Sequence, residues 1–253
     1  MFKFTIEPNR LKSMFSQALR LKGGTSPIDS VLMKINSDGA RFEARLAGDI
    51  MVLANYNKSF FKTLEVDKEE EFMVNTELVK KRLAYGFKGE TITVQTDNEK
   101  VIITGDETDD RVTQKLDAIS YENAVPFTYK KTEIGIVPEK DGQLMTFAFS
   151  VLVPVDKFTD SLPYNEATLT TNENGKMLLN FTDELGERSR PIPYKNPKKM
   201  EPTTILFNFE EFQALMSMFT GEIWLSGDEK KILLSQTNSD FSLTYAFAPK
   251  KAD

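Results

Sequence analysis

The chain has 253 residues, with 38 Asp and Glu against 32 Lys and Arg, and it contains no cysteine and no histidine. These absences exclude disulfides, thiolate metal sites and imidazole bases, and with them many classes of enzyme. The net charge of -6 predicts a surface that repels nucleic acid unless basic residues gather on one face. No apolar run is long enough to span a membrane and residues 1–10 lack a signal-peptide core, so we expect a soluble, intracellular protein.

Short strands and two amphipathic helices are predicted in the first half of the chain. Phe2, Phe4 and Ile6 alternate as in a strand, and residues 9–21 form a helix with one apolar stripe and one polar, basic face. Strands follow around turns at 38–39 and 47–49, and the acidic run 67–71 predicts a solvated loop. The remaining predictions are a strand at 72–74, a helix at 76–85, a hairpin over 92–103 and a strand at 111–116.

The second half has a similar series of predicted elements. They are a strand at 147–153, a helix at 156–162, a hairpin of 167–171 with 176–182, a loop at 186–202, a strand at 204–208, a helix at 209–219 and strands at 222–226, 231–236 and 241–247. Between the halves, residues 115–144 contain two prolines and two glycines and keep no period of 3.6 or 2. This stretch therefore predicts a connector.

Two pairs of segments indicate an internal duplication. Residues 72–105 and 205–236 share the order of apolar strand, Asn, amphipathic helix, Gly-Glu, alternating strand, acidic turn ending in Lys, and second apolar strand. Residues 2–19 and 147–162 also correspond, each as a strand followed by a helix. Matches in the same order on both sides of a connector predict two similar domains, 1–117 and 144–253, joined by a linker at 118–143. The expected fold class is α+β, with antiparallel sheets and two helices in each domain.

Several short motifs carry a resemblance to a known family. They are MFKF with LKSMFSQAL at 1–4 and 11–19, VNTELVKKRL at 74–83, IGIVPE at 134–139 and YAFAPKK at 245–251. Together they resemble the sliding clamps of the proliferating cell nuclear antigen (PCNA) family over nearly the whole chain. The resemblance implies a DNA-clamp fold and a homotrimeric ring around duplex DNA, lined by helices. It also implies a processivity factor for DNA replication and repair, with no catalysis, no cofactor and no metal.

The resemblance also implies partners and a location. The partners are double-stranded DNA, DNA polymerase, a clamp loader and other proteins that carry a short hydrophobic-aromatic motif. The location is the cytoplasm or nucleoid of an archaeon, or the nucleus or host cell of a eukaryotic or viral system.

Sliding on DNA requires phosphate contacts that exchange quickly and do not read bases. In the first half, basic residues lie on or beside the two predicted helices, where the family's ring lining falls: Arg10, Lys12, Arg20, Lys22, Lys80, Lys81 and Lys88. An ordinary solvated helix face is the alternative for any one of them. The second half offers only Lys157, and its helix 209–219 has Glu210 and Glu211 and no basic residue. We therefore expect lopsided DNA contact, or a ring that includes another subunit.

By resemblance, partner proteins bind a hydrophobic pocket under the linker. The residues that correspond to its walls are Leu46, Ile50, Val52, Ile134, Ile136, Pro138, Ala246, Ala248 and Pro249. Ile50 and Val52 have the alternative of being core strand residues, whereas an exposed apolar linker is hard to explain without a partner. Subunit contact in the family pairs edge strands, which predicts residues 111–116 of one chain against 176–182 of the next.

Three other functions remain open at this stage. The chain can be a regulatory or heteromeric-ring clamp subunit with weak DNA contact, or a β-rich protein-binding module without DNA. The third function is that of an enzyme, in which Asp106, Asp109 and Asp110 would be the magnesium ligands. Their spacing fits no known ligand loop, so a charged turn after a strand is the simpler interpretation.

Overall fold

A computed structural model describes residues 1–19, 30–45, 50–75, 89–97, 100–106, 111–115, 128–158, 164–183 and 186–250. The predicted helix at 76–85 and most of the one at 156–162 lie outside these ranges. The chain divides into two compact units. Unit 1 comprises Met1–Leu46, Met51–Pro126 and Thr237–Leu243, and unit 2 comprises Ala47–Ile50, Phe127–Gln236 and Thr244–Asp253.

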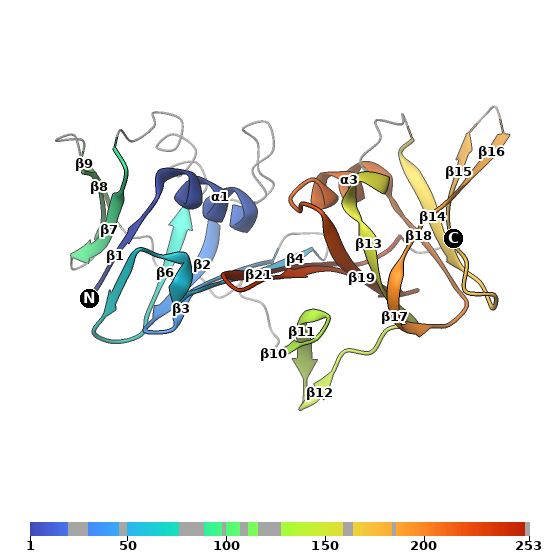
Figure 1. The fold of residues 1–253 in the computed structure, drawn as a ribbon, viewed down its shortest axis with the longest axis horizontal. Coiled ribbons are helices and arrows are strands. Elements are labelled where there is room, and N and C mark those ends of the chain that lie inside the picture. The colour runs from blue at the N-terminus through green and yellow to red at the C-terminus, as the bar shows by residue number, and fades with distance from the viewer. Residues whose placement is uncertain are drawn as a thin grey trace. The chain divides into compact units, whose positions relative to one another are not determined.

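Unit 1 contains two antiparallel sheets and the helix α1 (Figure 1). One sheet has the strand order β5-β1-β7-β8-β9, and the other has the order β4-β3-β2-β6 and continues from β4 into β21 (Phe241–Phe247). The elements are β1 (Phe2–Ile6), α1 (Pro8–Leu19), β2 (Ser30–Asn36), β3 (Gly39–Arg45), β4 (Met51–Asn57), the 3-10 turn η1 (Lys58–Phe60), β5 (Thr63–Val66), β6 (Glu70–Asn75), β7 (Ile92–Asp97), β8 (Lys100–Gly105) and β9 (Arg111–Lys115).

The core of unit 1 follows from the two periodicities in its sequence. Alternate residues of β1 are buried, and the ring of Phe2 stacks on that of Phe72 with centroids 5.4 Å apart. The helix α1 begins at Pro8, whose fixed φ suits the first helical position. Its stripe packs on the second sheet, where Phe15 meets Phe42 edge to face at 5.8 Å, and the hydroxyl of Tyr56 donates to the Met14 carbonyl at 3.1 Å. The predicted strand and helix at this end are confirmed.

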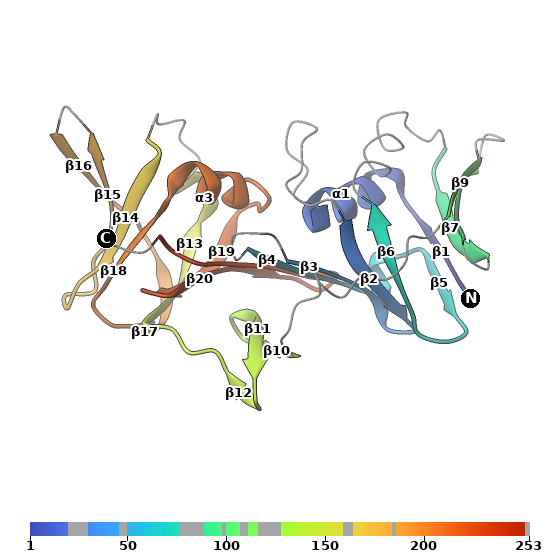
Figure 2. The ribbon, with the colours of Figure 1, turned by 180° about the vertical axis from the view of Figure 1, so that it is seen from behind.

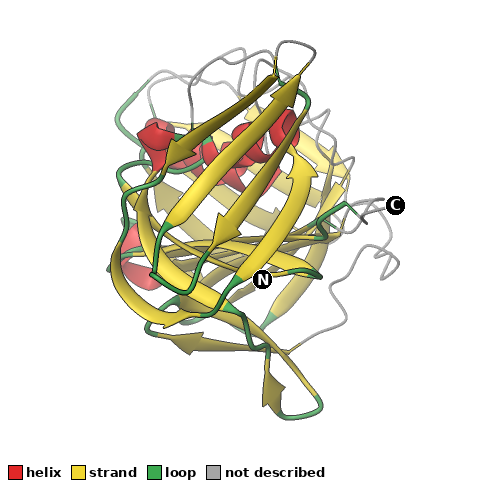
Figure 3. Ribbon diagram, turned by 90° about the vertical axis from the view of Figure 1, so that its right-hand side faces the viewer, coloured by secondary structure: helices red, strands yellow, loops and turns green. Residues whose placement is uncertain are grey.

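Unit 2 repeats the two sheets and adds a small third one (Figure 2). Its elements are β10 (Thr128–Thr132), β11 (Gly135–Lys140), β12 (Gln143–Leu144), β13 (Phe149–Pro154), the 3-10 turn η3 (Val155–Lys157), β14 (Glu166–Thr171), β15 (Met177–Asp183), β16 (Gly186–Pro191), β17 (Lys195–Met200), β18 (Thr203–Asn208), α3 (Phe209–Met216), β19 (Glu222–Asp228), β20 (Lys231–Thr237) and β21 (Phe241–Phe247). Strands predominate in the described residues, as Figure 3 shows. None of the described helices has the length and apolar character needed to cross a membrane.

The strand pairings of the two units are the same, which confirms the predicted duplication. Unit 2 has the orders β17-β13-β19-β20-β21 and β16-β15-β14-β18. Each strand of these two sheets therefore has a counterpart in unit 1: β13 corresponds to β1, β14 to β2, β15 to β3, β16 to β4, β17 to β5, β18 to β6, β19 to β7, β20 to β8 and β21 to β9. The match of strand order is stronger evidence of duplication than the match of residue types.

Two predicted irregular segments are strands instead. Residues 128–144 of the predicted connector form the antiparallel sheet β10-β11-β12, and the predicted loop at 186–202 contains β16 and β17. Both β16 and β17 are end strands of their sheets, with side chains that are mostly exposed. An end strand tolerates Pro and Lys because one of its edges needs no partner, so its sequence resembles that of a loop.

The strand β21 has residues in both units. Its first residues, up to Leu243, belong to unit 1, where the strand lies next to β4. The backbone N–H of Asn57 donates to the Asp240 carbonyl at 2.8 Å, and the Asn57 side-chain amide donates to the Ser239 carbonyl at 2.7 Å. From Thr244 onward the strand belongs to unit 2, next to β20.

Candidate DNA-facing and partner-binding surfaces

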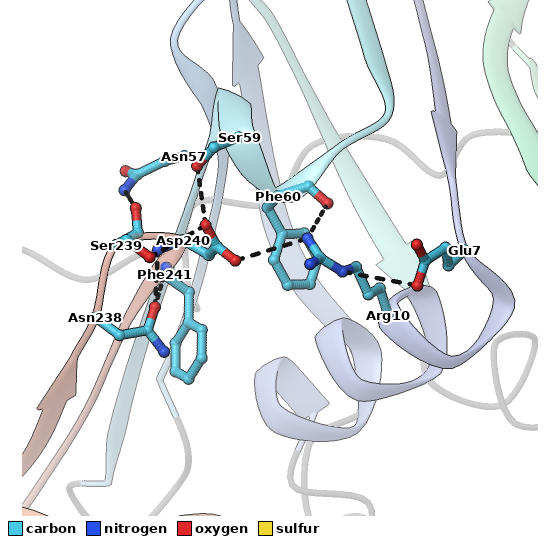
Figure 4. Close-up of polar contacts among 9 residues, drawn as sticks. All are labelled: Glu7, Arg10, Asn57, Ser59, Phe60, Asn238, Ser239, Asp240 and Phe241. Atoms are coloured by element: carbon cyan, nitrogen blue, oxygen red, sulfur yellow. Dashed lines mark hydrogen bonds and ion pairs between the residues drawn. The ribbon is translucent and has the colours of Figure 1, made fainter.

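Arg10 on α1 is held by contacts within unit 1 (Figure 4). Its guanidinium donates to the Phe60 carbonyl at 3.1 Å and lies 5.4 Å from the centre of the Phe60 ring. The same group lies 3.7 Å from the carboxylate of Asp240 and 3.9 Å from that of Glu7. Asp240 also accepts a hydrogen bond from the hydroxyl of Ser59 at 3.1 Å. These contacts give Arg10 a structural role, since they connect α1 to η1 and to the β20–β21 turn.

The other predicted DNA-binding residues fall into two groups. Lys12 is exposed on α1, and no ion pair joins it to another residue in the part of the chain that the structure describes. Lys157 lies in η3, where its ammonium is 3.3 Å from the carboxylate of Asp156. The remaining residues lie outside the described ranges: Arg20, Lys22, Lys80, Lys81 and Lys88. Among the described predicted contacts, Arg10, Lys12 and Lys157, the charge of Lys12 is thus the most available to an anionic ligand.

The acidic residues of α3 have a local explanation. Asn208 caps the helix, because its side-chain oxygen accepts from the Glu211 backbone N–H at 3.0 Å. Glu210 and Glu211 lie in the first helical turn, where negative side chains are favourable next to the positive end of the helix dipole. The buried face of the helix consists of Phe209, Phe212, Leu215 and Met216. The exposed part of α3 therefore carries no positive charge toward solvent.

Residues 135–138 of the apolar segment at 134–138 pack within unit 2 as part of β11. The side chains of Ile136 and Val137 are 3% and 2% exposed, and Pro138 is also buried. The hydroxyl of Thr244 on β21 donates to the Ile136 carbonyl at 3.2 Å, which fixes β11 over that strand. The β10–β11 turn is held as well, by an ion pair of 2.8 Å between Glu133 and Lys198. Packing within unit 2 thus accounts for part of the apolar character that the sequence assigned to a partner.

The predicted pocket residues differ in how much of them a partner can reach. Leu46 lies outside the described residues. The buried members are Ile50, Val52, Ile136, Pro138 and Ala246. Ile134 and Pro249 are partly exposed, and Ala248 is exposed. The tail that carries Ala248 and Pro249 is fixed in unit 2, since the Lys250 backbone N–H donates to the Leu206 carbonyl at 2.9 Å and the Lys250 ammonium pairs with Glu166. Ile134, Ala248 and Pro249 are therefore the described members of this set with surface that is accessible to a partner.

In unit 2, the strand that the sequence predicts to be a sheet edge is not one. Residues 177–182 of the predicted segment belong to β15, which is covered on both edges by β14 and β16. One end strand of this sheet is β16, and one end strand of the five-stranded sheet of unit 1 is β9, as predicted. Because this segment has no open strand edge, the prediction that it pairs with an edge strand of a neighbouring chain is wrong, and β16 is an end strand where the sequence predicted a loop. The sequence signal was a run of charged residues with no buried face, GERSRP.

The register of these end strands shows which face their charged side chains occupy. Arg111 pairs with Thr104, on the outer face of its sheet, while the alternate residues Phe4 and Val94 point to the core. Glu187 pairs with the exposed Thr182, which is on the outer face of its own sheet. Arg111 and Glu187 are both exposed. Arg111 on β9 and Glu187 on β16 thus have opposite charges, and each lies on the outer face of its sheet at an end strand.

Asp106 has a structural role of its own. Its carboxylate accepts hydrogen bonds from the Thr91 hydroxyl at 2.7 Å and from the Thr91 backbone N–H at 3.0 Å. The Thr91 hydroxyl, foremost, holds the pKa of the Asp106 carboxyl below its ordinary value. Asp109 and Asp110 lie outside the described residues. Across the described ranges, no three acidic, histidine or cysteine side chains gather as a metal site requires.

Comparison with solved structures identifies the fold. The chain matches a structure described as the C-terminal region of FEN-1 bound to A. fulgidus PCNA, with a TM-score of 0.79, 10% sequence identity and 100% of both chains covered. Searches by sequence against protein-family models and curated proteins give no match. The chain has the DNA-clamp fold of PCNA, so the predicted fold class is confirmed. At this identity the likeness concerns the fold alone.

Proposed function

We propose that this chain is a DNA sliding clamp. Copies of it join head to tail into a ring around duplex DNA, and the ring tethers a DNA polymerase and other replication and repair proteins without catalysing a reaction. The clamp fold supports this function. The observation that carries it is the repeated strand order, because β21 and β4 are neighbours while their counterparts β9 and β16 each end a sheet.

Ring closure follows from the duplication in two steps. Within unit 1, the first residues of β21 lie beside β4. The counterparts of these strands are β9 and β16, which end their sheets. Pairing β9 of one copy with β16 of the next would repeat a contact that the chain already makes once. Such a contact uses different surfaces on the two copies, so it gives a closed ring if the rotation closes. The resemblance to clamps implies three copies.

Charge on the end strands agrees with this pairing. If the outer faces of the two sheets are continuous across the junction, Arg111 of one copy and Glu187 of the next share a face. Opposite charges across paired strands stabilise them modestly, and like charges destabilise them. Exchanging the charges of Arg111 and Glu187 therefore tests this pairing.

Light scattering over a dilution series tests the proposal. The native chain should have about three times the 28.7 kDa mass of one copy. Arg111→Glu and Glu187→Arg should each lower the mass at a given concentration, and the double variant should restore it. Lys3→Glu is the control, because it makes the same charge change on an exposed residue of β1, inside the same sheet. A monomer at every concentration would refute a ring built from this chain alone.

A regulatory or heteromeric-ring clamp subunit is the second candidate. The acidic start of α3 and the pairing of Lys157 with Asp156 favour it, since both reduce the positive charge that unit 2 offers to DNA. Salt-dependent retention of the ring on circular DNA, with release on linearisation, would favour the sliding clamp. A stable ring that circular DNA does not retain would favour the second candidate.

A further inference from the structure

The described helices of unit 2, α3 and η3, offer little positive charge, but an end strand of the same unit does. The strand β16 carries Arg188 and Arg190 at alternate positions, separated by Ser189. Alternate residues of a strand point to the same face of its sheet. The two guanidinium groups are therefore on one face, and the question is which one.

The cross-strand register answers this question. Arg188 lies opposite Phe181 and Arg190 opposite Leu179, and residues directly opposite each other in an antiparallel pair share a face. Phe181 and Leu179 are 1% and 0% exposed. The ring of Phe181 packs edge to face on Phe209, the first residue of α3, with centroids 4.8 Å apart. Both arginines are thus on the face of the sheet that carries α3.

Arg188 is available for an external ligand. Its side chain is exposed, and in the described ranges no hydrogen bond or ion pair joins its guanidinium to another residue. Arg190 is partly exposed and takes part in contacts within the chain. A guanidinium presents planar paired donors, which suit phosphate oxygens better than an ammonium does.

We propose that Arg188, supported by Arg190, is a contact of this chain to the phosphate backbone of duplex DNA. The proposal rests on the sliding-clamp function, in which the helix-bearing faces point toward DNA. In unit 2 the positive charge on this face then comes from the strand β16 and not from α3. The contact is to phosphate and reads no bases, because a single exposed guanidinium on a strand edge has no groove-reading element behind it.

Binding of a labelled duplex, measured by fluorescence anisotropy over a series of salt concentrations, tests the proposal. Arg188→Gln should weaken binding at each salt concentration and make the dependence of log affinity on log salt shallower by about 1. Arg188→Lys should retain most of the affinity, since the charge remains. The matched control is Lys176→Gln, which removes the same charge from an exposed residue in the turn before β15.

The outcomes separate this inference from the function on which it rests. If the native ring shows no salt-dependent DNA binding, the sliding-clamp function fails and the inference with it. If the native ring binds DNA and Arg188→Gln binds equally well, only the inference is wrong. The mass of the Arg188→Gln variant is measured in parallel, because a loss of ring mass would assign Arg188 to subunit contact and overturn the DNA role.

Discussion

The carboxylate of Asp240 lies 3.7 Å from the guanidinium of Arg10 and joins the last β-turn of the chain to its first helix. Asp240 is fixed from the other side by Ser59, and its backbone carbonyl is fixed by Asn57. Arg10 also donates to the Phe60 carbonyl. A residue that the sequence assigns to DNA is thus part of the structure of unit 1.

Arg10→Ala should therefore lower the free energy of unfolding by about 1–3 kcal/mol, because it leaves Asp240 and the Phe60 carbonyl without this donor. Urea denaturation measures this change. Lys12→Ala is the control on the same helix, with an expected change within about 0.5 kcal/mol and weaker DNA binding. Equal stability of the Arg10 and Lys12 variants would contradict the structural role.

Gly39→Ala should destabilise unit 1 by about 2 kcal/mol or more. Gly39 has a φ of 153°, and a Cβ atom at this position would lie 2.0 Å from the Tyr56 carbonyl oxygen. Backbone atoms of β4 would have to move to admit it. Gly142→Ala is the comparison, because Gly142 has a φ of 76° and no atom within 4 Å of its Cβ position. In thermal unfolding, the Tm of Gly39→Ala should be well below that of Gly142→Ala.

The Asp106 carboxyl should titrate below its ordinary range in the native chain and closer to it in Thr91→Val, which lacks the hydroxyl donor. A lowered folded pKa contributes stability above the pKa of the unfolded state, and this contribution is lost as the pH falls through the folded pKa. NMR titration of the carboxyl carbon measures the effect, with Thr93→Val as control. An unchanged Asp106 pKa in Thr91→Val would show that the hydroxyl is not its cause.

Ile134 and Ile136 should respond differently to replacement by Ser. Ile136 is 3% exposed, so Ile136→Ser should lower the free energy of unfolding by about 2 kcal/mol or more. Ile134 is partly exposed, so Ile134→Ser should leave the free energy of unfolding nearly unchanged. It should weaken the binding of a peptide that carries one apolar and two aromatic anchor residues. Calorimetry measures the peptide affinity. If the Ile134→Ser variant bound the peptide with full affinity, the β10–β11 turn would not be part of the partner-binding surface.

The sequence predicts those strands that have one buried face. Phe2, Phe4 and Ile6 alternate because β1 lies over the core, and the same pattern predicts β7 and β8. The strands β16 and β17 have no such pattern, because side chains on both of their faces are mostly exposed. Their backbone pairing depends on neighbours that are distant in the sequence, so composition alone predicts a loop.

The candidate site was predictable to a lesser extent. Helical spacing predicts a polar face that contains Ser13, and Ser13 is exposed. It cannot predict that Arg10 meets Asp240, since that contact joins opposite ends of the chain. The apolar linker was interpreted as a partner surface, yet Ile136 is buried and its carbonyl accepts from Thr244. Whether an apolar residue in a connector faces solvent depends on the sheet beneath it.

The division of β21 between the units has a consequence for synthesis on the ribosome. Unit 1 takes Thr237–Leu243 from near the end of the chain, and Asn57 and Tyr56 both contact this segment. Residues up to Pro126 emerge long before it, so the nascent first unit must wait with the edge of β4 uncovered. An exposed strand edge of this kind is a template for pairing with other chains. The order in which the polypeptide leaves the ribosome therefore makes the completion of unit 1 one of the last events of folding.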